Sequence, residues 1–242
     1  MREILTIAKK GEEGVSGNVE DFYNKYAAGY DDAHTSPRHV AEDLATKTML
    51  GHFECDKGPV LDIGCGTGLG LRLLDLAPGD YLGVDISSGM IKQAREFHPL
   101  HRFIHEDFES FRGVGFQTAI SLFGVINYAD DPKVFVRNML RCIRPGGRFF
   151  VMSLLNDPEY GFISDGGREE SSHPMKFYNY DNLCTIFDDV KTKAMCEFIW
   201  PSMEMRGTVK SMAARMFKKS TKKEIIPGIL PRYICVVGVL DK

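Results

Sequence analysis

Several features that would indicate other protein classes are absent from this 242-residue sequence. The six cysteines include no C-x-x-C pair, and Cys65, Cys142 and Cys235 lie inside apolar runs, as buried free thiols do. No stretch is long and apolar enough to cross a bilayer, and the five uncharged residues before Lys9 are too few for a signal-peptide core. We therefore expect a reduced, cytoplasmic protein that does not associate with a membrane.

The sequence also lacks an excess of basic residues. Its 30 Lys and Arg against 33 Asp and Glu give a net charge of −3, so no overall positive field attracts nucleic acid, which we do not expect as a partner. One local exception is residues 206–223, which carry seven basic residues and no acidic one. This segment could contact an anionic substrate, an RNA backbone or a membrane surface, or it could be a solvated helix beside a cap.

Length and hydrophobic pattern predict the fold class. Residues 1–242 are long for one minimal domain and short for two, so we expect a single domain with additions. Between residues 59 and 155, short apolar runs alternate with amphipathic segments. This alternation predicts an α/β protein with a mostly parallel sheet and helices on both faces. Two late apolar runs, 191–200 and 232–240, are interpreted as an antiparallel hairpin that closes the sheet.

Four glycines at every second position follow the first expected strand: Gly64, Gly66, Gly68 and Gly70. A glycine-rich turn at this place indicates a nucleotide-type site, where backbone N–H groups and a helix N-terminus approach the ligand. The dinucleotide fingerprint G-x-G-x-x-G fails in every register, because a leucine occupies the third glycine position each time. What remains is D-x-G-x-G-x-G, which begins at Asp62.

That pattern resembles motif I of the class I, Rossmann-like S-adenosylmethionine-dependent methyltransferases, and the resemblance extends over about residues 20–155. It implies the seven-stranded class I methyltransferase fold. Asp85, after the second strand, matches the family acid that holds both ribose hydroxyls, and a carboxylate with two acceptor oxygens suits a vicinal diol. Asp107, after the third, matches the acid that accepts from the adenine amino group. Gln117 departs from the Asp that is usual there, at a mainly structural position.

The resemblance implies S-adenosyl-L-methionine as cofactor and S-adenosyl-L-homocysteine as product. The predicted cofactor-binding residues are Tyr23, Tyr30, Asp62, Gly64, Cys65, Gly66, Gly68, Asp85, Ile86, Met90, Asp107, Phe108, Leu122 and Phe123. The tyrosines belong to an expected N-terminal lid, residues 1–35, with Tyr30 preferred to Tyr23, although both could simply pack on the sheet. Asp62 could reach the cofactor's ammonium or cap the turn, and Met90 could pack on adenine or in the core.

The methyl acceptor and the catalytic residue are left open. The sequence has no D/N-P-P-Y/F after its fourth strand, which argues against methylation of adenine, cytosine or glutamine amino groups. A small-molecule O, N or C acceptor is therefore the default, enclosed by cap insertions at 155–176 and 201–230. Asn127 and Tyr128 could line its pocket, and His173 and Tyr128 are the candidates for the catalytic residue.

Parts of the sequence are also compatible with two other kinds of function and with a metal site. An RNA- or ribosome-associated methyltransferase could use residues 206–223, and a partner subunit could bind the cofactor without turnover. Three histidines, His98, His101 and His105, have spacings that permit a metal site, but Pro99 breaks any helix that would align the first two. We predict no metal, and the oligomeric state is left open.

Overall fold

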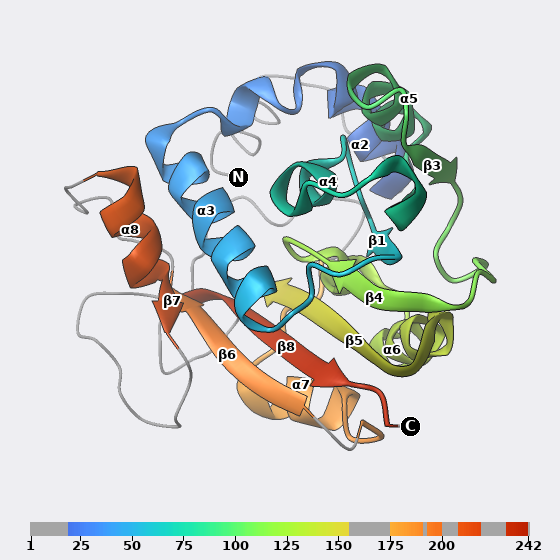
Figure 1. Ribbon diagram of the computed structural model, residues 1–242, viewed down its shortest axis with the longest axis vertical. Helices are drawn as coiled ribbons and strands as arrows, with labels where there is room; N and C mark the ends of the chain where they lie inside the picture. Colours follow the sequence, from blue (N-terminus) through green and yellow to red (C-terminus); the bar gives the residue numbers. More distant parts are fainter. Residues whose placement is uncertain (1–18, 155–174, 191–192, 200–207, 219–230, 242) are drawn as a thin grey trace.

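The computed structural model describes residues 19–154, 175–190, 193–199, 208–218 and 231–241 (Figure 1). One sheet runs through them in the strand order β3-β2-β1-β4-β5-β8-β6-β7. The strands are β1 Val60–Ile63, β2 Tyr81–Asp85, β3 Arg102–His105, β4 Phe116–Ser121, β5 Ile143–Leu154, β6 Lys193–Ile199, β7 Phe217–Lys218 and β8 Pro231–Val239. The helices of four or more residues are α2 Val19–Tyr26, α3 Pro37–His52, α4 Leu69–Leu74, α5 Ser88–Phe97, η4 Val125–Tyr128, α6 Pro132–Cys142, α7 Tyr180–Ile186 and α8 Val209–Met216.

The predicted topology is confirmed, with one strand more than expected. Strands β1 to β5 pair in parallel, whereas β8 runs antiparallel between β5 and β6. The eighth strand is the two-residue β7, which pairs with β6 at the edge of the sheet. Strand β5 begins at Ile143, and its pairing with β4 jumps from Phe116↔Ile143 to Thr118↔Arg148. The intervening Pro-Gly-Gly turn is therefore a bulge within the strand rather than a break before it.

Helices cover both faces of the sheet (Figure 1), and alternation along the strands directs side chains to these two faces. On one face, Leu61, Phe149 and Ile234 pack with α6 and α7. On the other, Val60 and Phe150 pack with α3, and the side of the sheet nearer β3 packs with α4 and α5. Both faces of β1 are therefore buried, as the sequence predicted for a parallel sheet.

Gln117, the departure from the family pattern, has a structural role. Its side chain accepts a hydrogen bond from Nε of Arg144 at 2.7 Å and donates one to the carbonyl of Gly146 at 3.4 Å. It therefore fastens the bulge of β5 to the start of β4, which agrees with the mainly structural role that we expected.

Asn127, in η4, is fully buried and joins two distant segments. Its Oδ1 accepts from the backbone N–H of Leu154 at 2.9 Å, and its Nδ2 donates to the carbonyls of Leu154 and Lys176. Its own carbonyl accepts from the N–H of Lys176 at 2.7 Å. Because the side-chain amide of Asn127 is engaged in hydrogen bonds within the protein, we do not expect this side chain to contact an acceptor directly.

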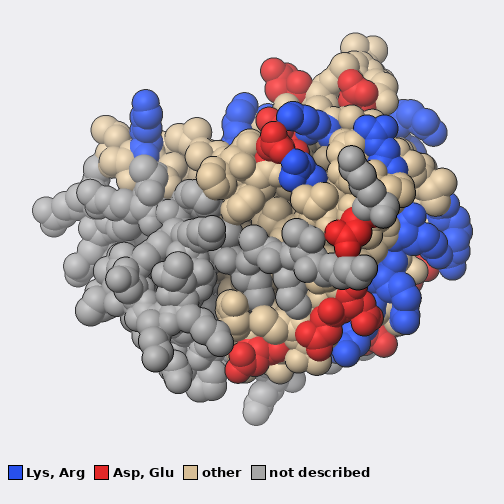
Figure 2. Space-filling view, turned by 60° about the horizontal axis from the view of Figure 1, so that its bottom comes forward, with Lys and Arg blue, Asp and Glu red and all other residues tan. Residues whose placement is uncertain are grey.

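Charge and hydropathy of the described residues agree with the sequence. On the face drawn in Figure 2, acidic and basic side chains are interspersed over the described part. Within the described residues, no helix is long and apolar enough to cross a bilayer. The single-domain assignment, the lid and the cap insertions stay predictions; residues 1–18, 155–174, 200–207 and 219–230 lie outside the described chain.

Candidate cofactor-binding site

The carboxyl ends of β1 and β2 place the glycine turn beside Asp85. Ile63 and Val84 are register partners, and the N–H of Gly64 donates to the carbonyl of Val84 at 2.8 Å. The N–H of Gly66 then donates to Oδ2 of Asp85, and the N–H of Ser87 to Oδ1, each at 2.8 Å. Burial raises the pKa of Asp85, and these two hydrogen bonds oppose that rise. Each carboxylate oxygen keeps a further lone pair, so the pair can accept from a diol.

Space around the glycines separates a ligand-facing residue from packing residues. All of Gly64, Gly66 and Gly68 have positive φ, at +69°, +53° and +97°. A Cβ on Gly64 would collide with Val125, and a Cβ on Gly68 would lie 2.8 Å from the His98 ring. At Gly66, in contrast, nothing lies within 4 Å of that position. The backbone is therefore open to a ligand at Gly66, which fits an adenosine held by the neighbouring Asp85.

Asp62 is directed into the protein rather than toward Gly66. It is 2% exposed, it accepts a hydrogen bond from the Tyr81 hydroxyl at 2.6 Å, and a Cβ on Gly70 would collide with it. Burial raises its pKa to about 7, although the Tyr81 hydrogen bond lowers it. Neither of the two roles predicted for Asp62, capping of the turn or contact with the cofactor, explains its hydrogen bond with Tyr81. Contact with the cofactor stays a prediction.

A group of three tyrosines lies next to Asp85. The hydroxyls of Tyr23 and Tyr128 are 3.3 Å apart, and the ring of Tyr23 also meets that of Tyr30 edge-on, with centroids 6.3 Å apart. Burial raises the pKa of all three, and the negative charge of Asp85 adds to the rise at Tyr23 and Tyr30. The phenols are therefore neutral at pH 7: they can donate hydrogen bonds, but Tyr128 is poorly suited to remove a proton.

Two polar residues of the N-terminal segment, which sequence reasoning missed, fasten it to this site. Oδ1 of Asn24 accepts from Oγ of Ser87 and from the N–H of Gly89, both at 2.8 Å. Asp31 accepts from Oγ1 of Thr67 at 2.7 Å and pairs with Arg72 at 3.1 Å. Pairs so distant in sequence carry no local signal, since "YNKY" and "GYDD" look like parts of an ordinary polar helix face.

The remaining predicted residues divide between the site edge and the core. Asp107 is exposed and accepts from the N–H of Glu109, which leaves its other oxygen at the surface, while Ile86 is half-buried. Four predicted residues are buried: Cys65, Met90, Phe108 and Leu122. Phe108 and Leu122 pack in the opposite core layers, so any cofactor contact of theirs involves only part of each residue.

Phe123 is a conformational exception. It is half-buried with φ of +54°, and its ring packs edge-on against Tyr233 at a centroid distance of 5.8 Å. A non-glycine residue rarely adopts this backbone conformation, which Glu54 and Asp75 also have, away from the site. The strain falls directly after β4, at the edge where β1 and β2 present Gly66 and Asp85.

Neither the candidate histidines nor a metal site adds to this group. Within the described residues there is no cluster of three or more His, Cys, Asp or Glu side chains that could hold a metal. His98 packs on Gly68, and burial lowers its pKa. His101 and His105 hydrogen-bond to the carbonyls of Leu76 and Ile86 at 2.9 Å. His173 lies outside the described residues.

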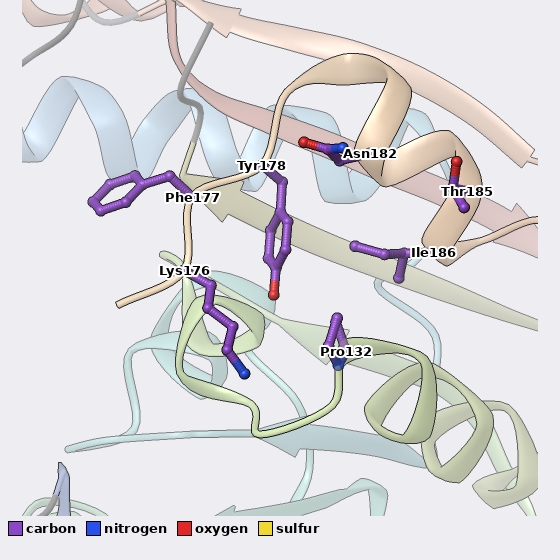
Figure 3. A pocket seen from close by; sticks show the side chains of 7 residues that line it. All are labelled: Pro132, Lys176, Phe177, Tyr178, Asn182, Thr185 and Ile186. Carbon is purple, nitrogen blue, oxygen red and sulfur yellow. The ribbon is translucent and has the colours of Figure 1, made fainter. Parts of the chain in front are cut away.

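A separate hollow of about 520 Å³ lies between the start of α6 and α7 (Figure 3). Its lining residues are Pro132, Lys176, Phe177, Tyr178, Asn182, Thr185 and Ile186. None of them is among the predicted site residues, and the hydroxyl of Tyr178 is itself fully covered. The predicted site at Gly66 and Asp85 therefore does not include this hollow.

Comparison with known sequences identifies a methyltransferase domain. Residues 61–151 match the family model described as a methyltransferase domain. A protein of Methanocaldococcus jannaschii, MJ1252, is 30% identical over 142 residues, 57% of this chain and 52% of that protein. A ubiquinone biosynthesis O-methyltransferase of Xanthomonas oryzae pv. oryzae is 22% identical over 134 residues, 52% of this chain and 56% of its own. The chain thus spans about half the length of the curated relatives it matches.

Comparison of structures agrees with the fold. A solved structure described as a complex between the Haloferax volcanii Trm112 methyltransferase activator and a proposed methyltransferase superposes with a TM-score of 0.67. The match covers 91% of this chain and 98% of that chain, at 20% identity. The fold is that of the class I methyltransferases. Residues 61–151 therefore form a methyltransferase domain, and the fold agrees with the family resemblance found in the sequence.

Substitution of two glycines tests the separation of ligand-facing and packing roles. Gly64→Ala is expected to lower the free energy of unfolding by about 2–4 kcal/mol, because the new methyl collides with Val125 at a positive φ. Gly66→Ala meets no neighbour and is expected to cost only about 1 kcal/mol, while weakening S-adenosylhomocysteine binding about tenfold. Denaturant unfolding and calorimetric titration measure the two effects. Equal stability losses with unchanged binding would contradict the assignment.

Proposed function

We propose that this protein transfers the methyl group of S-adenosylmethionine to a small-molecule O, N or C acceptor by in-line displacement. The observation that carries the proposal is the open backbone at Gly66 beside the carboxylate of Asp85. This carboxylate accepts hydrogen bonds from the backbone N–H groups of Gly66 and Ser87. Similarity to a ubiquinone biosynthesis O-methyltransferase supports a small acceptor.

In this proposal the protein binds and aligns the reactants. Asp85 accepts hydrogen bonds from the two ribose hydroxyls, and the exposed carboxylate of Asp107 accepts from the adenine amino group. Tyr23 and Tyr30 cover the site from the N-terminal segment and exclude water. The bound cofactor supplies an activated methyl group on a sulfonium, so alignment of the acceptor with it contributes much of the rate.

In this proposal Tyr128 does not act as the base that deprotonates the acceptor. The pKa of Tyr128 is raised by burial, so its hydroxyl is protonated at pH 7 and can orient an acceptor as a hydrogen-bond donor. His173 stays a candidate base for acceptors that must lose a proton.

Calorimetric titration tests cofactor binding directly. We expect S-adenosylmethionine and S-adenosylhomocysteine to bind with Kd values below about 100 µM, whereas NAD and ATP do not compete. The site offers carboxylates to a diol and an amine, and a diphosphate next to Asp85 would be repelled. No binding of either methionine compound, or tighter binding of NAD, would overturn the proposal.

Two alternatives are decided by further measurements on the same protein. Use of an RNA acceptor would appear as co-purifying nucleic acid and as activity that falls steeply with salt. A partner subunit that binds the cofactor without turnover would bind S-adenosylmethionine yet methylate nothing in a broad metabolite screen. The Haloferax volcanii structure contains an activator, so the screen should be run with and without an activator of that kind.

A further inference from the structure

The two backbone groups that hold Asp85 belong to loops that the N-terminal segment grips. On one side, Ser87 donates its N–H to Oδ1 of Asp85 and its hydroxyl to Asn24. On the other, Gly66 donates its N–H to Oδ2 of Asp85, and the next residue, Thr67, donates its hydroxyl to Asp31. Each carboxylate oxygen is therefore linked, through one loop, to one residue of the segment 19–35.

Each of these links consists of more than one hydrogen bond. Oδ1 of Asn24 receives hydrogen bonds from the Ser87 hydroxyl, the Ser88 hydroxyl and the Gly89 N–H, at 2.8, 3.2 and 2.8 Å. Asp31 uses both carboxylate oxygens, one for Thr67 and one for Arg72. Ser87 and Thr67 are buried, so their hydroxyls would lose hydrogen bonds if the segment moved away.

We propose that Asn24 and Asp31 are positioning residues for Asp85. By holding the Ser87 and Gly66–Thr67 loops, they fix the direction of the Asp85 carboxylate so that its free lone pairs meet both hydroxyls of a ribose. This inference rests on the proposed function, because it takes the ribose of S-adenosylmethionine as the ligand of Asp85. It predicts that the N-terminal segment governs recognition of the sugar hydroxyls, and not merely coverage of the cofactor.

A ligand that lacks the hydroxyls separates positioning from coverage. The variants are Asn24→Leu and Asp31→Ala, with Asp32→Ala as a matched control, because Asp32 is an exposed acid next to Asp31. The probes are S-adenosylhomocysteine and its 2′,3′-dideoxy analogue, each titrated calorimetrically. We expect each variant to bind S-adenosylhomocysteine about tenfold more weakly but the dideoxy analogue less than twofold more weakly than the unmodified protein does. The control should change neither affinity.

Further measurements keep the test decisive. Asn24→Asp retains an oxygen acceptor toward Ser87 and Gly89, and we expect it to bind S-adenosylhomocysteine within about threefold of the unmodified protein. If Asp31→Ala does not fold, Asp31→Asn takes its place. Equal weakening for both ligands would overturn the inference, because it would mean that the segment only covers the site. Absence of binding by the unmodified protein would instead overturn the proposed function, and the two failures are thereby distinguished.

Discussion

Replacement of Asp85 by alanine is expected to weaken S-adenosylhomocysteine binding by at least about 100-fold, because two hydrogen bonds to a charged acceptor are lost at once. The same change also removes the acceptor for the N–H groups of Gly66 and Ser87, which then lose their orientation. Methyl transfer should fall in parallel at cofactor concentrations below the new Kd. Calorimetric titration gives the affinity, and transfer from labelled cofactor gives the rate.

The matched control for this experiment is Asp80→Ala. Asp80 is an exposed acid directly before β2, whereas Asp85 ends the same strand, so the two substitutions remove equal charge from opposite ends of one element. We expect the Asp80 variant to bind the cofactor as the unmodified protein does. If both variants lost affinity to the same degree, the effect would be one of net charge, and Asp85 would not be the ribose acceptor.

Replacement of Asp62 by asparagine is expected to make the protein more stable at pH 8 than at pH 4, relative to the unmodified protein. The pKa of Asp62 rises from its ordinary value of 3.8 to about 7 in the folded state because the carboxyl is buried. A raised pKa contributes stability that is fully present below about pH 4 and is lost as the pH rises through 7. At 1.36 kcal/mol for each unit, the difference amounts to about 3–4 kcal/mol. An asparagine carries no such charge and still accepts from Tyr81.

Denaturant unfolding of both proteins at several pH values measures this difference. Only the difference between them isolates Asp62, because Asp43 also has a pKa raised by burial, to about 6, and titrates in the same range. Tyr81→Phe provides a second check: it removes the hydrogen bond that favours the charged form of Asp62, so the loss of stability should become larger and extend to higher pH. A pH-independent difference between Asp62→Asn and the unmodified protein would show that Asp62 is already ionised in the folded state.

Local patterns were sufficient to predict the sheet and the position of the site. Alternation of strand and helix periods located β1 to β5, and parallel strands bring their carboxyl ends to one edge, so Gly66 and Asp85 had to be neighbours. The sequence also carried one signal that was overlooked. Asp62 lies between Leu61 and Ile63 in a strand, and alternation therefore directs it away from their face, toward α4.

Other features depend on contacts that no local pattern reveals. Asn24 and Asp31 hydrogen-bond to residues more than 30 positions away, and the local sequence around a polar residue does not indicate such distant partners. The bulge in β5 has the composition of a turn, Pro-Gly-Gly, so its sequence does not distinguish a bulge from a turn. In the sequence, the four glycines look equally suited to approach a ligand. The three-dimensional surroundings distinguish them: a Cβ would collide with neighbouring residues at Gly64, Gly68 and Gly70, but not at Gly66.

The buried amide of Asn127 has a consequence for how this protein can diversify. Because Asn127 bonds to both Leu154 and Lys176, the end of β5 and the segment that leads into α7 are held side by side. A change in the number of residues between these two positions is therefore expected to leave β5 and α7 in place, since each doubling of the length of a closed segment costs only about 0.6 kcal/mol in closure entropy. Under the proposed function, the acceptor-binding cap can therefore change while Gly66 and Asp85 keep their positions.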